Sequence, residues 1–202
     1  MTRIAFLVLA SVFFVGAAHA GLIDEVRERT GLRDAQRGEF SQEKRIASLS
    51  KPLRASGQFV YLKERGLLWR IEQPYASDAT ITATTLVQQV RGKTVLKVDA
   101  QTQPAYSAVS RIFMALVGND WKALEQDFMI AGNVSGASWQ LVLTPRGGLF
   151  ASFASTLTLS GSRAIERLDI AEKNGDRTVY TFSKVREAGA LSADEESRFA
   201  LK

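Results

Sequence analysis

Hydrophobic and polar residues alternate along most of the chain with a period of two. In residues 67–72, Leu67, Trp69 and Ile71 share one face, while Arg70 lies on the other. This alternation predicts β-strands that bury one face. Similar segments, rich in aromatic and β-branched residues and bounded by turn residues, predict further strands. The predicted strands cover residues 37–47, 58–63, 67–72, 80–82, 86–90, 94–98, 128–130, 139–143, 156–159, 165–171 and 177–185.

Apolar residues at helical spacing interrupt this pattern. Residues 22–30 form a short amphipathic segment, and residues 105–124 contain a longer one. Pro104 suits the first turn of the longer helix, Gly118 suits its end, and Asp120 can cap a short continuation. The sequence therefore predicts two or three short helices.

About ten or eleven strands with short connections predict a single domain of mainly β class (α+β), built on one strongly curved antiparallel sheet. The apolar face of such a sheet must be covered, and the predicted helices are the available cover. The Asn174-Gly175 pair also predicts a type I′ hairpin, in which both central residues have positive φ.

The N-terminus has the three parts of a secretory signal peptide. Arg3 is its only charge, residues 4–17 are apolar, and Ala18-His19-Ala20 forms a small-residue cleavage signal. The apolar run is shorter than the roughly 20 residues that a membrane-spanning helix needs. We therefore expect residues 1–20 to be cleaved, and residues 21–202 to form one domain in the periplasm.

Composition excludes several kinds of chemistry. The chain has no Cys, and its one His, His19, lies in the segment that we expect to be removed. Ser-His-Asp and Cys-His catalysis and Cys or His metal sites are therefore excluded from the mature protein. Residues 21–202 have 25 basic and 21 acidic side chains without a basic stripe, so no nucleic acid partner is expected.

Carboxylates do not change this interpretation. Asp120, Glu125 and Asp127 lie close together in the sequence, as do Glu195 and Glu196. A paired-carboxylate hydrolase needs two acids on either side of one bond, and no spacing here predicts such a pair. We expect no enzymatic activity, no cofactor and no metal.

Several short motifs occur in a fixed order over nearly all of residues 21–202. They are Gly38-Glu39-Phe40-Ser41-Gln42, Gly57-Gln58-Phe59-Val60-Tyr61, the nine residues from Gly66 to Pro74, Ile81-Thr82, Gly118-Asn119-Asp120-Trp121, and the seven residues from Trp139 to Pro145. In these motifs the chain resembles the LolA family of periplasmic outer-membrane lipoprotein carriers, and in particular its divergent LolA-like branch.

The resemblance implies an open half-barrel, covered by a helical lid, whose hydrophobic interior holds acyl chains. Family members take lipoproteins from an inner-membrane ABC transporter and pass them to the outer-membrane receptor LolB. The expected partners are therefore an acylated lipid or lipoprotein cargo, an inner-membrane exporter and an outer-membrane LolB-like acceptor. A monomer is expected.

The inward face of the sheet and the lid supply the candidate ligand site. From the pattern alone such a face is more often packed core, whereas the resemblance favours a cavity that is only partly filled. The candidate cavity residues are Phe40, Phe59, Tyr61, Leu67, Trp69, Ile71, Ile81, Ile112, Phe113, Leu116, Phe128, Trp139, Leu141, Leu143, Leu157 and Phe182.

One segment departs from the family pattern. Well-known members have a basic residue followed by Arg and Pro before the Trp-containing strand, and that Arg helps control lid opening. Here Leu62-Lys63-Glu64 takes this place. Lys63 keeps the charge but lacks the planar fork of donors of Arg, so we expect it to contact the lid or a cargo headgroup. A glycolipid or other acyl ester remains an alternative cargo.

Two other classes of function stay open from the sequence. The same half-barrel could serve as an envelope sensor or interaction module that binds lipid or peptide as a signal. An enzyme is the third alternative, and its activity would survive filling of the cavity by detergent.

Overall fold

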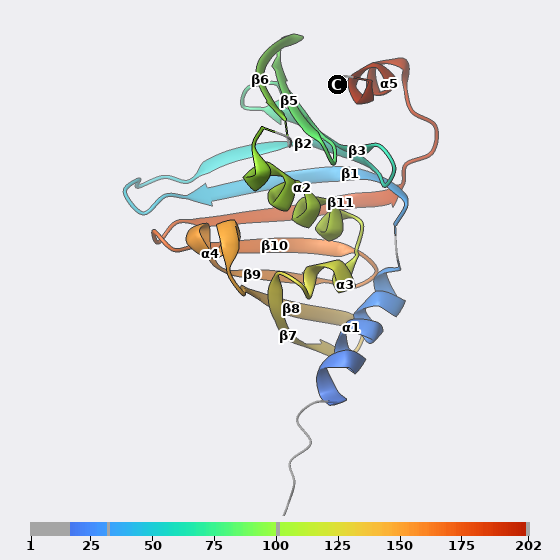
Figure 1. Cartoon of the computed structure of the whole chain (residues 1–202), viewed down its shortest axis with the longest axis vertical. Coiled ribbons are helices and arrows are strands. Elements are labelled where there is room, and N and C mark those ends of the chain that lie inside the picture. Colours follow the sequence, from blue (N-terminus) through green and yellow to red (C-terminus); the bar gives the residue numbers. More distant parts are fainter. Residues whose placement is uncertain (1–16, 32, 100–101, 201–202) are drawn as a thin grey trace, which may run out of the picture.

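A single antiparallel sheet of eleven strands forms the body of the protein in the computed structural model, which describes residues 17–31, 33–99 and 102–200 (Figure 1). The predicted mainly β fold, with one open, curved sheet and short helices, is confirmed. The strands are β1 Ala35–Arg45, β2 Leu53–Leu62, β3 Gly66–Gln73, β4 Ser77–Ile81, β5 Thr85–Val90, β6 Lys93–Asp99, β7 Phe128–Ser135, β8 Ser138–Pro145, β9 Ala154–Gly161, β10 Ile165–Glu172 and β11 Arg177–Glu187.

The sheet consists of two meanders that meet in its middle. Its strand order is β6-β5-β4-β3-β2-β1-β11-β10-β9-β8-β7, so the first six strands pair consecutively. The two meanders join where β1 pairs with β11, from Gln36 opposite Glu187 to Arg45 opposite Arg177. The first and last strands of the fold therefore lie side by side at its centre.

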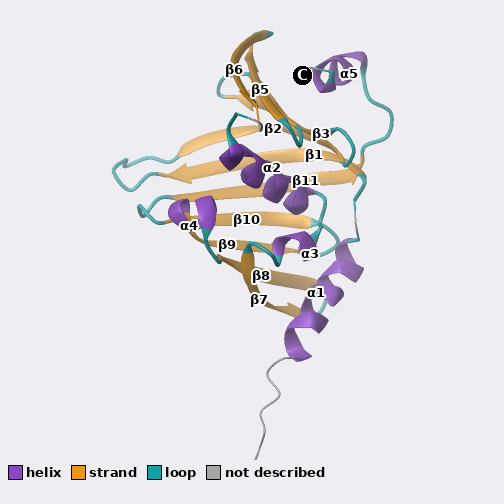
Figure 2. Ribbon diagram, viewed as in Figure 1, coloured by secondary structure: helices purple, strands orange, loops and turns teal. Residues whose placement is uncertain are grey.

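Five short helices accompany the sheet (Figure 2). Three of them, α2, α3 and α4, lie across one face of the sheet, while α1 lies beside β7. The predicted cleavage position after Ala20 falls inside α1, and residues 1–16 lie outside the described residues, so cleavage stays a prediction. The helices are α1 Ala17–Thr30, α2 Pro104–Val117, α3 Trp121–Leu124, α4 Gly148–Phe153 and α5 Ala193–Phe199.

The main core lies between β7–β10 and the helices α1, α2 and α3. Trp121 is fully buried, and its ring packs edge-on against Trp139, with 5.5 Å between ring centroids. The Trp121 indole donates a hydrogen bond to Thr30, and the Trp139 indole donates one to the carbonyl of Ser162. Both buried indoles are therefore hydrogen-bonded, as large polar aromatic side chains in cores usually are.

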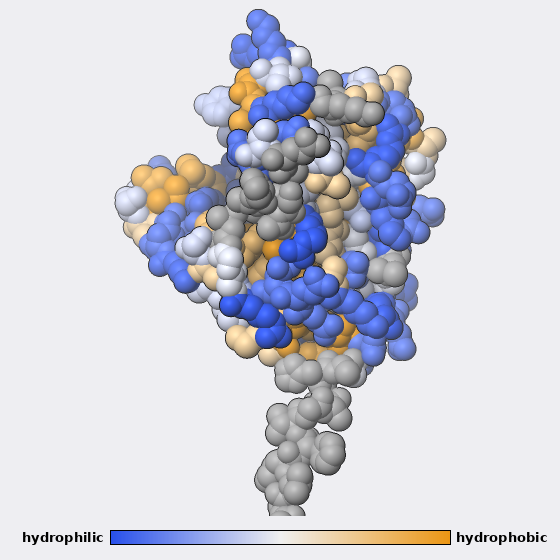
Figure 3. Space-filling model, in the orientation of Figure 1, coloured by the Kyte–Doolittle hydropathy of each residue, from blue (hydrophilic) through white to orange (hydrophobic). Residues whose placement is uncertain are grey.

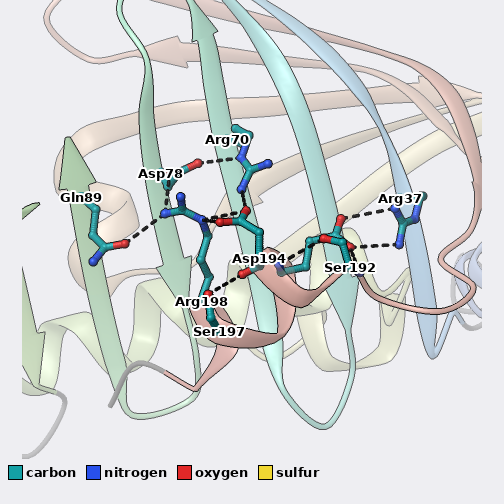
Figure 4. Close-up of polar contacts among 9 residues, drawn as sticks. Arg37, Arg70, Asp78, Gln89, Ser192, Asp194, Ser197 and Arg198 are labelled. Atoms are coloured by element: carbon teal, nitrogen blue, oxygen red, sulfur yellow. Dashed lines mark hydrogen bonds and ion pairs between the residues drawn. The ribbon is translucent and has the colours of Figure 1, made fainter. Parts of the chain in front are cut away.

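The opposite face of β2 and β3 is covered by α5, which the sequence analysis did not predict. Phe199 is buried against Val60 and Leu68. Around this contact, Arg198 forms an ion pair with Asp78, and Arg70 bonds both Asp78 and Asp194 (Figure 4). The C-terminal helix therefore docks through one aromatic side chain surrounded by a network of ion pairs.

The hairpin between β10 and β11 corrects one expectation. Gly175 has a φ of +88°, but Asn174 is not among the described residues with positive φ, so the predicted type I′ turn is wrong. The Gly175 amide donates to the Glu172 carbonyl, and the Asn174 side chain accepts a hydrogen bond from the Asp176 amide. A longer loop results, because the Asn174 side chain satisfies the backbone locally and only glycine adopts the left-handed conformation.

The surface on the α2 side is mixed in polarity (Figure 3). Apolar side chains are exposed at the tip of the β1–β2 hairpin, where Leu49 and Leu53 are each about half exposed. Across the described ranges, helices are too short or too polar to cross a membrane.

Candidate functional site

A narrow apolar cavity separates α2 from the middle of the sheet. Its volume is about 50 Å³, which leaves room for only a few water molecules. Its walls come from β1, β2, β3, β9, β10, β11 and the C-terminal half of α2. The lining residues are Gln36, Phe59, Trp69, Phe113, Leu116, Val117, Asn119, Leu159, Ala164, Ile165, Leu168, Tyr180, Phe182 and Val185.

Aromatic rings from β2, β3 and β11 form one wall of the cavity, and Phe40 of β1 stacks behind it. Phe40 and Trp69 stack with 3.8 Å between ring centroids. Phe182 meets Phe59 edge-on at 5.9 Å, and Tyr180 meets Trp69 edge-on at 5.8 Å. The two edge-on contacts have a geometry that aromatic pairs prefer, whereas Phe40 and Trp69 stack more closely, almost face to face.

Gly38 gives the Phe59 ring its position. A Cβ atom at Gly38 would lie 2.8 Å from Cε1 of Phe59, which is closer than a real contact permits. Gly38 is paired with Phe59 across β1 and β2. The missing side chain on β1 therefore leaves the space that the ring on β2 occupies.

The helix α2 forms the opposite wall. Phe113, Leu116 and Val117 line the cavity. Ser110 Oγ donates a hydrogen bond of 2.6 Å to the carbonyl of Thr82, in the turn between β4 and β5. Arg111 forms an ion pair with Asp127. Side-chain packing on one face and these two polar contacts hold α2 over the sheet.

Two side-chain amides lie at one end of the cavity. Gln36 is 6% exposed, and its Nε2 donates to the carbonyl of Val117. Asn119 is 1% exposed and has a left-handed backbone, with φ of +57°. Its Nδ2 has no hydrogen-bond partner among the described residues. The remaining lining is almost wholly apolar.

The described lining contains no carboxylate, amine or guanidinium group. Burial is the main cause that raises the pKa of Tyr180, and the charge of Glu172 adds to it, so this phenol stays neutral over the physiological range. The arrangement can bind an apolar ligand and offer a few hydrogen bonds to it. In the part of the chain that the structure describes, no cluster of three or more His, Cys, Asp or Glu residues could hold a metal.

The predicted cavity residues fall into four groups. Phe59, Trp69, Phe113, Leu116 and Phe182 line the cavity. Phe40 stacks on Trp69 behind this wall, and Ile71 lies two residues further along β3, half-buried. Three others, Tyr61, Leu67 and Ile81, belong to the adjoining cluster under Met114 of α2. The last group packs in the main core beside α1 and α3, and does not line this cavity: Ile112, Phe128, Trp139, Leu141, Leu143 and Leu157.

Lys63 lies outside the cavity. It is exposed and pairs with Asp34 at 3.1 Å, and this hydrogen bond is the main cause that raises the pKa of Lys63. Lys63 lines a separate groove of about 800 Å³ along the other side of α2. The charged residues of this groove are Arg27, Arg33, Asp34, Lys63, Arg111, Asp120 and Lys122.

Several lining residues were missed by the sequence analysis. Tyr180 and Val185 share β11 with Phe182, and Leu159 and Leu168 continue the apolar alternation of β9 and β10. Alternation could have identified Tyr180, Leu159 and Leu168. Val185 would fall on the opposite face by alternation, and it lines the cavity because β11 is irregular at Lys184, where φ is +52°. Gln36 and Asn119 gave no such signal, because their role depends on what surrounds their amide groups in the folded protein.

Comparison with protein families identifies the chain. A family model described as outer membrane lipoprotein carrier protein LolA-like matches residues 15–196. The chain belongs to this LolA-like family. The resemblance stated from the sequence motifs is thus confirmed, and family membership fits the open sheet and helical cover described above. No curated protein matches the chain.

Solved structures with a similar arrangement share little sequence with this LolA-like protein. A putative outer membrane lipoprotein-sorting protein domain from Vibrio parahaemolyticus is 8% identical, with a TM-score of 0.46 over 89% of this chain and 99% of that one. A LolA superfamily protein from Nitrosomonas europaea is 10% identical, with a TM-score of 0.46 over 86% and 96%. The MucA/MucB complex of Pseudomonas aeruginosa contains a chain that is 14% identical, with a TM-score of 0.42 over 88% of this chain and 60% of that one.

Proposed function

We propose that this protein is a periplasmic carrier that binds the acyl chains of a lipoprotein or another acylated lipid and shuttles them towards the outer membrane. The observation that carries the proposal is the uncharged, largely apolar cavity between α2 and the sheet, in a chain that belongs to the LolA-like family. Residues 1–20 act as the cleaved signal peptide in this proposal.

Burial of hydrocarbon supplies the binding free energy. Each buried methylene contributes about 0.8 kcal/mol, so a chain of a dozen methylenes contributes roughly 10 kcal/mol before the costs of ordering. A cavity of about 50 Å³ is too small for such a chain. Cargo entry therefore requires α2 to move away from the sheet, as a lid does.

The groove on the other side of α2 suits the polar end of the cargo. It has five basic and two acidic side chains, with Lys63 among the basic ones. An excess of positive charge attracts anionic headgroups. In this proposal the acyl chain lies in the cavity, while Lys63 and its neighbours contact the headgroup or the lid.

Release follows from differences in affinity. The carrier has no energy source of its own in this proposal, so an acceptor must offer the acyl chain a more favourable environment. An inner-membrane exporter as donor and an outer-membrane LolB-like protein as acceptor fit this requirement.

Native mass spectrometry of protein purified from the periplasm without detergent tests the proposal. We expect added mass that organic solvent extracts as acyl lipid, and this extract would name the cargo class. Protein without added mass, which also takes up no fluorescent fatty acid, would argue against carriage and favour the interaction module.

Two variants with the same new charge locate the site. Trp69→Glu places a carboxylate in the cavity wall, so we expect loss of lipid binding. Gln58→Glu adds the same charge at an exposed position of β2 and should leave binding intact. Circular dichroism establishes that both variants fold. A folded Trp69→Glu protein that still copurifies with lipid would show that the cavity is not the binding site.

A further inference from the structure

The side-chain amide of Asn119 has a hydrogen-bond donor, Nδ2, without a partner in the described residues. The side chain is 1% exposed, lines the cavity, and its Nδ2 has no partner in the described part of the chain. Buried amide groups are nearly always hydrogen-bonded, because desolvation without a compensating bond is unfavourable. An unpaired donor on a residue that lines an apolar cavity indicates an acceptor on the ligand.

Backbone conformation alone does not explain the choice of Asn. Asn119 follows the end of α2 with φ of +57°, a conformation that glycine adopts more readily and Asn tolerates. Glycine would satisfy the turn without burying an amide. The presence of an Asn side chain at this position therefore needs an explanation other than the backbone conformation.

The backbone carbonyls on either side of this turn accept hydrogen bonds from other groups. The carbonyl of Val117 accepts from Gln36, and the carbonyl of Gly118 accepts from the Arg33 amide at 3.1 Å. The backbone N–H of Asn119 donates a hydrogen bond to the carbonyl of Leu116 at 3.3 Å. Within this turn, the side-chain donor of Asn119 is left without a partner in the described residues.

We propose that Asn119 Nδ2 donates a hydrogen bond to the carbonyl oxygen of an ester- or amide-linked acyl chain. The cavity then selects acyl chains over ether-linked or plain hydrocarbon chains. This inference rests on the carrier function proposed above, and names the group of the cargo that the site recognises.

The position of Asn119 also orients the cargo. The preceding residue, Gly118, lines the basic groove on the other side of α2. With its carbonyl at Asn119, a cargo places its headgroup next to that groove. Its hydrocarbon chain extends along the aromatic wall of Phe59, Trp69 and Phe182.

Two ligands that differ only in the carbonyl test the proposal. 1-Decanoylglycerol contains an ester, whereas 1-O-decylglycerol has a methylene in place of the carbonyl. Titration calorimetry below their micelle concentrations should give the wild-type protein an affinity about fivefold higher for the ester, as expected for one hydrogen bond. In Asn119→Gly the ratio of the ester affinity to the ether affinity should fall to about one, because the donor is lost.

Further variants separate the amide from the backbone. Asn119→Asp keeps the shape and the turn but replaces the donor with an acceptor, so it should also lose the ester preference. Asn133→Ala, at an exposed position of β7, should keep it. With a 1-¹³C ester, the carbonyl resonance should shift downfield on binding to wild type and less on binding to Asn119→Gly.

The outcomes distinguish this inference from the function on which it rests. Equal affinities of wild type for ester and ether would overturn the role of Asn119 while leaving carriage intact. Binding of neither ligand would overturn both proposals. A large fall in the thermal stability of ligand-free Asn119→Gly would show that the amide has a structural partner, and would also overturn the inference.

Discussion

Phe40 on β1 and Trp69 on β3 stack with 3.8 Å between ring centroids, although β2 lies between their strands. Gly57 on β2 is opposite Phe40 in the pairing of β1 with β2. The stacked pair thus reaches across β2 and joins three strands into a single apolar surface.

Substitution of Gly57 should damage the sheet at this point. A Cβ atom there would lie 1.9 Å from the carbonyl oxygen of Arg70, so β2 and β3 would have to separate locally. We expect Gly57→Ala to lower the free energy of unfolding by about 2 kcal/mol or more, measured by urea denaturation. Gly147→Ala, where a Cβ meets nothing within 4 Å, is the control. Equal stabilities of the two variants would contradict the close approach.

Trp69 should report cargo binding by fluorescence. It lines the cavity, whereas Trp121 and Trp139 are buried in the main core. A fatty acid that carries a bromine or nitroxide quencher on its chain should therefore quench one tryptophan of three. In Trp69→Phe the quenching should vanish while calorimetry still shows binding. Quenching that persists in this variant would place the ligand next to the core tryptophans instead.

Asp169 should make part of the stability depend on pH. The Arg177 side chain, which bonds both carboxylate oxygens, is the main cause that lowers the pKa of Asp169, and Arg167 adds to it. A lowered folded-state pKa stabilises the protein above the unfolded-state pKa of about 3.9, and this contribution is lost as pH falls through the folded-state pKa.

The stability of a variant without the Asp169 carboxylate, measured at several pH values, tests this prediction. At pH 7 we expect Asp169→Asn to be less stable than wild type by about 0.5–1 kcal/mol, since Arg177 is exposed to solvent. In urea titrations the difference should shrink as pH falls below the unfolded-state pKa of about 3.9 and through the lower folded-state pKa. Glu125→Gln, at an exposed position, should show a smaller effect. A difference independent of pH would mean that the ion pair does not cause it.

The sheet could be predicted from the sequence because each strand alternates independently of the rest of the chain. The helix α5 could not, because only one large apolar side chain, Phe199, docks it. Its sequence signal was the capping box, in which Ser192 and Glu195 bond each other's backbone amides. That motif lies in a charged tail where hydrophobic periodicity gives no indication.

The cavity was harder to predict than the sheet. Leu141 and Leu159 have the same alternating pattern, yet Leu159 lines the cavity and Leu141 packs in the core away from it. What separates them is the path of α2, which depends on contacts made by residues far away in the sequence. The unpaired amide of Asn119 likewise exists only in the folded protein.

Removal of the Phe199 ring should release α5. The ring is 7% exposed against Val60 and Leu68, with the Arg65 guanidinium carbon 5.0 Å from its centroid. Phe199→Ala should cost about 3 kcal/mol in urea denaturation. Phe153→Ala removes a ring that is 44% exposed and should cost much less. Similar losses in both variants would mean that α5 does not depend on this contact.

Ser110 should control how readily the lid opens. Its hydroxyl, in a side chain 1% exposed, links α2 to the Thr82 carbonyl at 2.6 Å. Ser110→Ala removes this bond, which contributes about 1 kcal/mol and corresponds to roughly fivefold more open lid at equilibrium. Amide hydrogen exchange in α2 and the rate of fatty acid uptake, followed by quenching of Trp69, should rise together. Ser138→Ala, at the exposed start of β8, should change neither. If exchange rises but uptake does not, cargo enters by a route that does not require α2 to move.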